Sequence, residues 1–143
     1  MAKVIAVCVS EKKGEQKVPQ SVITLRPAHG VEGDAHAGTW HRQISLLAKS
    51  SVDKLQDKID FPLLPGAFAE NILLDGMEVR TLPIGSRLRI GEAELEITQI
   101  GKECHNDCVI RQKAGDCVMP REGVFARVLT GGDVKAGDEV TEL

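Results

Sequence analysis

The sequence has few aromatic residues and no long apolar segment. Its 143 residues include one tryptophan, three phenylalanines and no tyrosine. A site that held a flat ring by stacking would need such side chains, so we expect any ligand to be recognised by hydrogen bonds and charge. The apolar run at the N-terminus is short and leads into a charged cluster. It is too short for a signal peptide or a membrane span.

Charge of one sign and a disulfide pattern are also lacking. The formal net charge is −3 with both signs interspersed, so no overall field would attract nucleic acid or an anionic membrane. The four cysteines are unevenly spaced, which favours reduced thiols and a cytoplasmic protein. The length predicts a single domain over residues 1–143, which would bury roughly 68–70% of its unfolded surface and need no disulfides.

Short apolar segments separated by glycine and proline turns predict a mostly β protein. Strands are expected at residues 3–9, 21–25, 43–48, 87–90, 93–100 and 135–143. Gly91-Glu92 is suited to a hairpin turn between two of them. Residues 11–20 are expected to form a loop, and residues 131–134 a turn. Because closure removes exposed strand edges, we expect a closed or partly closed barrel.

Two short helices are expected among these strands. The first spans residues 50–59, with Ser50 as N-cap and Asp53 completing a capping box. The second would begin at Pro120, because proline suits the first position of a helix. Its predicted apolar face comprises Val124, Phe125, Val128 and Leu129.

The segment from His29 to Arg42 holds three glycines and three histidines in fourteen residues. Glycine permits positive φ and a close approach of the backbone to a ligand, so this composition predicts a shaped loop. In one interpretation, His36, His41 and Arg42 form a polar wall of a pocket. In the other, the segment is a surface loop whose histidines satisfy backbone groups.

Glu70 and Asn71 lie between apolar residues. A carboxylate and an amide at the start of a strand need polar partners if they are buried. They would either hold the backbone of a pocket in shape, the interpretation that we prefer, or contact a ligand.

Residues 101–117 concentrate the reactive side chains of the chain. They hold Cys104, Cys108, Cys117, His105, Lys102 and Arg111. The thiolate is the form of cysteine that attacks electrophiles and binds metals, and neighbouring cations favour it. One of these cysteines would therefore accept sulfur as a persulfide or bind a soft transition metal.

Other interpretations of this segment stay open. Cys104, Cys108 and Cys117 with His105 would form a structural zinc site, for which the Cys-x3-Cys spacing is permitted. A dithiol redox pair is less well matched, because its usual spacing is Cys-x-x-Cys. The thiols would otherwise be inert and buried, as we expect for Cys8 in the first strand.

A series of landmarks in fixed order resembles the MOSC domain, the module found at the C-terminus of molybdenum cofactor sulfurases and in free-standing bacterial proteins. The landmarks are residues 30–34, His41, residues 65–72, residues 82–85, Ile90-Gly91, Cys104, residues 123–129, Gly132 and Gly137-Asp138. They cover the chain from about residue 22 to its end. The resemblance is strongest to the short free-standing bacterial form.

This resemblance implies a barrel-like β fold and a cysteine that carries sulfur or ligates molybdenum in the molybdopterin cofactor. That cysteine corresponds to Cys104, and a pyridoxal-phosphate-dependent cysteine desulfurase is the implied sulfur donor. We predict that His36, His41 and Arg42 form a pocket wall for an anionic pterin-phosphate ligand. The predicted bracing residues are Glu70 and Asn71, and the candidates for the phosphate, since the arginine fork suits it, are Arg121 and Arg127.

Two other functions remain compatible with the sequence. The first is a zinc-binding, non-catalytic adaptor. The second is a thiol-dependent enzyme acting on small N-oxygenated or electrophilic molecules. The sequence does not decide whether the protein is an enzyme, nor its oligomeric state, and it predicts neither a nucleic-acid nor a membrane partner.

Overall fold

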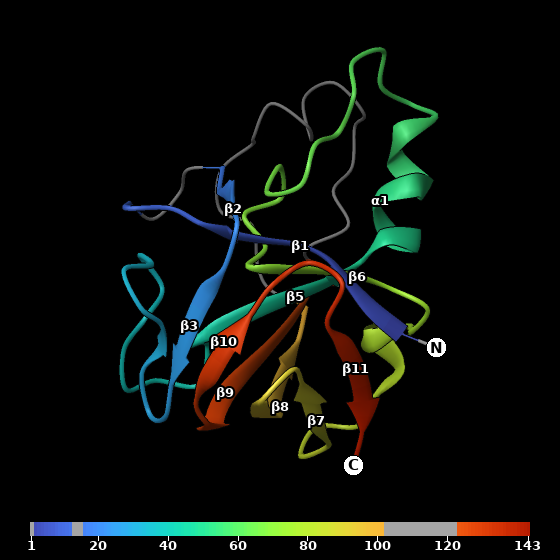
Figure 1. Ribbon diagram of the computed structural model, residues 1–143. Helices are drawn as coiled ribbons and strands as arrows, with labels where there is room; N and C mark the ends of the chain where they lie inside the picture. The colour runs from blue at the N-terminus through green and yellow to red at the C-terminus, as the bar shows by residue number, and fades with distance from the viewer. Residues whose placement is uncertain (1, 13–15, 102–122) are drawn as a thin grey trace.

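The computed structural model describes residues 2–12, 16–101 and 123–143, and its main feature is a β-barrel (Figure 1). Seven strands close in the order β11-β7-β8-β9-β5-β6-β1, because β1 also pairs with β11. Their bounds are β1 (Ala2–Val9), β5 (Ile44–Ala48), β6 (Ile72–Asp75), β7 (Arg87–Ile90), β8 (Ala93–Ile100), β9 (Val124–Thr130) and β11 (Glu139–Glu142). The predicted barrel is confirmed.

Short strands extend this framework. The strand β2 (Val18–Gln20) continues the sheet beyond β1. A small second sheet joins β10 (Gly132–Val134), β3 (Ile23–Arg26) and β4 (Gly30–Val31). The predictions of a loop through residue 20 and of a turn at 131–134 are therefore wrong where β2 and β10 occur. Pro19 is compatible with β2 because this strand lies at the sheet edge, where one backbone N–H is not needed.

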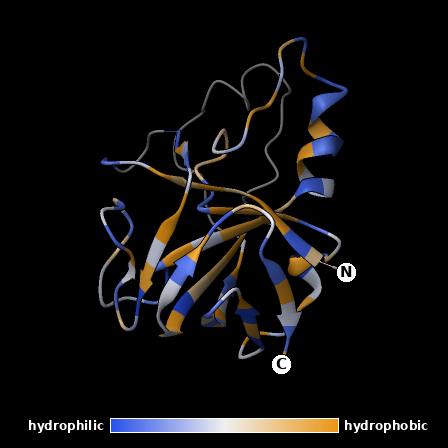
Figure 2. Ribbon diagram, in the orientation of Figure 1, coloured by the Kyte–Doolittle hydropathy of each residue, from blue (hydrophilic) through white to orange (hydrophobic). Residues whose placement is uncertain are grey.

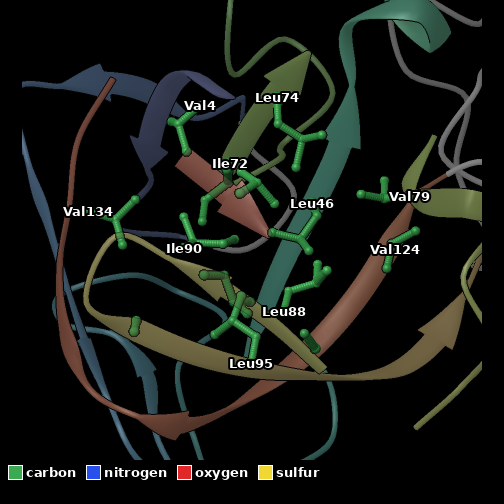
Figure 3. Close-up of a cluster of buried hydrophobic side chains, with 14 of the residues drawn as sticks. Val4, Leu46, Ile72, Leu74, Val79, Leu88, Ile90, Leu95, Val124 and Val134 are labelled. Atoms are coloured by element: carbon green, nitrogen blue, oxygen red, sulfur yellow. The ribbon is translucent and has the colours of Figure 1, made fainter. Parts of the chain in front are cut away.

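The barrel interior is filled by alternate residues of its strands. In the predicted β7–β8 hairpin, the inward-facing residues are all fully buried: Leu88, Ile90, Ala93, Leu95 and Ile97. They share the first apolar cluster with Leu46, Ile72 and Val124 (Figure 3). Orange and blue segments alternate along these strands in Figure 2. The outward pair Arg89–Glu94, 2.9 Å apart and partly exposed, contributes little stability.

The helix predicted over residues 124–129 is wrong, because this segment is strand β9. It lies between β8 and β5, pairing Ala126 with Ile97 and Val124 with Leu46. Val124 and Ala126 face the barrel interior, whereas Phe125 packs in a second apolar cluster outside it. A central strand covered on both faces is apolar at consecutive positions, and that pattern imitated helical spacing. Pro120 lies outside the described residues.

The helix α1 (Lys49–Gln56) covers part of the outer barrel surface (Figure 1). Its Val52 and Leu55, with Ile59 beyond its end, are buried in the second apolar cluster, as the sequence predicted. The capping box is wrong: the N-cap is Ala48, and the Ser50 hydroxyl donates to Glu78 at 2.6 Å. Glu78 precedes a 3-10 helix, η1 (Val79–Thr81). No helix in the described ranges is long and apolar enough to cross a membrane.

Candidate functional site

Glu70 shapes the turn that precedes β6. Its two carboxylate oxygens accept the backbone amides of Gly66 and Phe68, at 2.9 and 3.1 Å. Within this turn Gly66 and Ala69 have positive φ, at 89° and 62°, and the hydrogen bonds to Glu70 hold that uncommon backbone. Burial raises the pKa of Glu70 above its ordinary value, although these amides, its own amide and the charge of Lys17 partly offset it.

Asn71 links the strands on both sides of β6. Its carbonyl oxygen accepts the amide of Ser45 in β5 at 3.0 Å, and its side-chain nitrogen donates to the carbonyl of Cys8 in β1 at 3.0 Å. The side chain is fully buried. Glu70 and Asn71 therefore use their polar atoms on the backbone, which matches the preferred structural interpretation. Ligand contact by either residue stays a prediction.

A buried ion pair anchors the glycine- and histidine-rich loop. The ammonium of Lys17 lies 2.8 Å from Asp34 Oδ1, and neither side chain is exposed. Asp34 also accepts the backbone amides of Ser10 and His36, both at 3.0 Å. Burial alone would raise the pKa of Asp34, but the hydrogen bonds from the Lys17 ammonium and the Ser10 amide, with the charge of Lys17, lower it below its ordinary value.

Trp40 packs among the polar residues of this loop. Its ring is parallel to that of His36, with centroids 6.5 Å apart, and edge-on to that of His41 at 6.1 Å. The indole N–H donates to the carbonyl of His36 at 2.7 Å. The predicted wall residues His36 and His41 are therefore brought together, with Trp40 between them.

His41 and Arg42 meet the end of β8. His41 Nε2 and Arg42 Nε both contact Gln99 Oε1, at 2.8 and 3.0 Å. The side-chain nitrogen of Gln99 donates to the carbonyl of Gly101 at 2.7 Å. The side-chain oxygen of Gln99 therefore faces His41 and Arg42 as an acceptor. The hydroxyl of Thr98 donates to the carbonyl of His41. This end of the loop is thereby attached to β8 just before residue 102.

The guanidinium of Arg42 is supported by aromatic rings. Its central carbon lies 5.2 Å from the ring centroid of Phe125 and 6.0 Å from that of Trp40, within the range of a cation–π contact. Among the described residues, no hydrogen-bond partner is found for its two terminal nitrogens. Arg42 can therefore offer a planar, charged pair of donors to an anion.

Arg127 has a different setting. It lies on the exposed side of β9, and its guanidinium is 2.5 Å from the carboxylate of Glu96 in β8. A phosphate at this position would have to compete with Glu96. Its predicted role in phosphate binding stays a prediction.

Residues 102–122, which hold the predicted reactive side chains and Arg121, lie outside the described residues. This applies to Cys104, Cys108, Cys117, His105 and Arg121, so their roles stay predictions. Gly101 and Gly123, which flank the segment, are joined by a 2.6 Å backbone hydrogen bond. The fourth cysteine, Cys8, is fully buried. Burial and the charge of Glu70 raise the pKa of its thiol to about 12, although the charge of Lys17 opposes this.

Sequence reasoning missed three residues that build this region: Lys17, Trp40 as a packing residue, and Gln99. Lys17 and Gln99 contact the loop from 17 or more positions away in the chain, and no local pattern indicates such a contact. Trp40 adjoins His41 in the sequence, so its role could have been inferred from the scarcity of other aromatics.

One cavity lies apart from this region. A surface cavity of about 270 Å³ lies between the start of α1 and the end of β6. It is lined by residues 48–50 and 74–78, none of which is a predicted site residue. Within the described ranges, no three His, Cys, Asp or Glu side chains are arranged to hold a metal ion.

Comparison with solved structures places the fold among known proteins. The YuaD protein from Bacillus subtilis superposes with a TM-score of 0.73 and 21% identity, over 98% of this chain and 94% of that one. YiiM from Geobacillus stearothermophilus gives 0.75 and 18%, over 100% and 75%. YiiM from Escherichia coli gives 0.65 and 20%, over 100% and 70%. These identities support similarity of fold alone.

Sequence comparison identifies the family. No curated protein matches the chain significantly. The family model described as MOSC domain matches residues 33–141, a span that includes residues 33–42 of the glycine- and histidine-rich loop, the Glu70 turn and strands β5 to β11. The chain therefore belongs to the MOSC domain family, which is linked to the molybdenum cofactor sulfurases.

Proposed function

We propose that this protein carries sulfur, or ligates molybdenum, through the thiolate of Cys104 beside a pocket for an anionic pterin-phosphate ligand. The observation that supports the proposal most directly is the attachment of His41 and Arg42 to Gln99. Gln99 lies two residues before Gly101, and Cys104 follows three residues after Gly101. The five residues from Gln99 to Cys104 span at most about 18 Å of chain, a length compatible with the proposed approach of Cys104 to this polar wall.

The donor set suits an anionic ligand. The two terminal nitrogens of Arg42 lack hydrogen-bond partners among the described residues, and a guanidinium can bind two oxygens of a phosphate at once. The imidazole ring of His41 lies beside the Arg42 guanidinium, since both contact the same oxygen of Gln99. The molybdenum cofactor, when bound, would supply a metal ion that accepts a thiolate ligand. Arg42 and His41 would hold its charged groups, and Cys104 would provide the sulfur.

As a sulfur carrier, the protein would react by thiol exchange. The thiolate of Cys104 attacks the outer sulfur of a persulfide on a cysteine desulfurase. A new S–S bond forms on Cys104, the donor S–S bond breaks, and the donor cysteine leaves as a thiolate. The step needs no external oxidant, because the transferred sulfur keeps its oxidation state. It requires the ionised thiol, which Lys102, His105 and Arg111 would favour.

The direct test is transfer of labelled sulfur. The protein is incubated with a pyridoxal-phosphate-dependent cysteine desulfurase and sulfur-labelled cysteine, and the label is mapped on peptides kept free of reductant. We expect label on Cys104 and its loss in Cys104→Ser. Cys8→Ala is the matched control and should keep the label, because Cys8 is buried. Label confined to Cys117 would contradict the assignment of Cys104.

Metal analysis distinguishes the zinc-binding alternative. About one tightly bound zinc ion per chain, lost in Cys108→Ser and Cys117→Ser, would identify the adaptor instead of the sulfur carrier. Catalytic turnover of an N-oxygenated compound that depends on Cys104 would identify the thiol-dependent enzyme.

A further inference from the structure

The two ring nitrogens of His36 have different surroundings. Nδ1 lies 3.0 Å from the ammonium nitrogen of Lys17 and 3.7 Å from Asp34 Oδ2. The His36 side chain is 21% exposed, whereas those of Lys17 and Asp34 are fully buried. For the other nitrogen, Nε2, no hydrogen bond is found in the described part of the chain.

The ammonium of Lys17 requires three acceptors. Its nitrogen has three N–H donors and no lone pair, and it lies within 3.0 Å of Asp34 Oδ1, Ser10 Oγ and His36 Nδ1. Ser10 can accept because its own hydroxyl hydrogen is directed to the carbonyl of Lys12 at 3.2 Å. His36 Nδ1 can accept only through its lone pair, so the ring proton must be on Nε2.

The opposite tautomer fits the same distances poorly. A proton on Nδ1 would face the ammonium at 3.0 Å, while the nearest carboxylate oxygen is 3.7 Å away, beyond hydrogen-bond range. Asp34 does not need that proton, since Ser10, Lys17 and the His36 amide already donate to it. A buried carboxylate does need a compensating cation, and Lys17 supplies it. Glu70 is the other carboxylate whose charge interacts with Lys17.

We propose that Lys17 is a positioning residue that fixes His36 as the Nε2–H tautomer, so that Nε2 of this partly exposed side chain is a hydrogen-bond donor. Such a donor suits an acceptor such as an anionic oxygen. It does not suit a metal ion, because metal coordination needs a free ring lone pair. The use of this donor in the cofactor pocket rests on the proposed function, whereas the tautomer itself does not.

Nitrogen NMR of the histidine rings tests the tautomer directly. At about pH 8, where an unperturbed imidazole is neutral, we expect Nε2 of His36 to show the shift of a protonated nitrogen and Nδ1 that of an acceptor. A proton on Nδ1 in the unmodified protein would overturn the proposal. This measurement needs no variant and no ligand, so failure of the sulfur-transfer experiment would not affect it.

The double variant Lys17→Met/Asp34→Asn tests the role of Lys17 without leaving the buried Asp34 carboxylate unpaired. We expect both His36 nitrogens to move towards averaged shifts, because both tautomers become populated. Lys17→Arg, which keeps a side chain that only donates, should preserve the Nε2–H form. His41 is the internal control, since its Nε2 faces Gln99 and its shifts should not change. An unchanged His36 spectrum in a folded double variant would show that Lys17 does not set the tautomer.

Discussion

At the scale of single residues, Asn71 provides a direct test of the bracing role. Asn71→Ala would leave the Ser45 amide and the Cys8 carbonyl without their buried partners. Each such group costs about 1–3 kcal/mol, so we expect the free energy of unfolding to fall by about 3 kcal/mol or more in urea titrations. Asp133→Ala, which removes only an exposed hydrogen bond to Thr24, should change it by less than about 0.5 kcal/mol.

Cys8 should be chemically inert in the native protein. Its side chain is fully buried, and its thiol pKa is raised to about 12, so it offers almost no accessible thiolate to an alkylating reagent. We expect iodoacetamide at about pH 8 to modify Cys8 only after denaturation, while Cys104 reacts in the native state. Peptide mass spectrometry with and without urea measures both. Rapid native labelling of Cys8 would contradict its assigned burial.

The residues of the histidine loop were predictable in part. Local composition indicated a shaped loop, and the structure gathers His36, His41 and Arg42 around Trp40. The residues that fix their orientation, Lys17 and Gln99, were not predictable. Lys17 is followed by a short edge strand and Gln99 lies in an ordinary alternating strand, so their contacts depend on how distant segments fold together.

At the scale of elements, the turn before β6 and the segment before β2 pack without free space. A Cβ at Gly66, where φ is +89°, would lie 2.0 Å from the backbone oxygen of Lys17. Because that oxygen is a backbone atom, Gly66→Ala must displace either the turn or the segment just before β2. We expect it to lower the free energy of unfolding by more than about 3 kcal/mol, the upper end of ordinary substitutions.

Gly85→Ala is the matched control for that substitution. Gly85 has a similar φ, +95°, but a Cβ there would meet no atom within 4 Å. It should therefore cost only the strain of positive φ, about 1–2 kcal/mol. Equal losses for the two variants in urea titrations would show that the contact with Lys17 has no energetic weight.

Elements with local signals were predicted well, and elements that depend on distant pairing were not. The β7–β8 hairpin has strict alternation and a turn at Gly91-Glu92, so its register follows from nearby residues. Strand β9 has apolar residues on both faces because one face lines the barrel interior and the other packs in the second apolar cluster. Its sheet partner β5 is distant in the sequence. The start of α1 shows the same limit, since Ser50 bonds to Glu78, 28 positions away, instead of capping the helix.

At the scale of the whole molecule, the barrel separates two apolar regions. The interior is closed by the pairing of β1 with β11 and contains the first core. The second lies outside, where α1, Cys8, Phe68 and Phe125 pack together. Arg42 lies over Phe125 on this outer side. The barrel thus acts as a rigid support, and the candidate site is assembled on its outside from the histidine loop and the end of β8.

The buried carboxylates should make the stability of the molecule depend on pH in two opposite ways. The pKa of Asp34 is lowered by folding, so its contribution is present above the unfolded value of about 3.9 and is lost as pH falls through the folded value. The pKa of Glu70 is raised. Its contribution is therefore full below about pH 4.3 and is lost as pH rises through the folded value.

Urea titrations between about pH 2 and 8 separate these contributions with two variants. Lys17→Met/Asp34→Asn should lose less stability than the unmodified protein as pH falls below about 5, because the carboxylate that must be protonated is absent. Glu70→Gln should lose less as pH rises above about 4, since an amide keeps the size of the side chain and cannot ionise. Identical pH profiles for all three proteins would mean that neither carboxylate changes its proton affinity on folding, in contradiction to their burial and contacts.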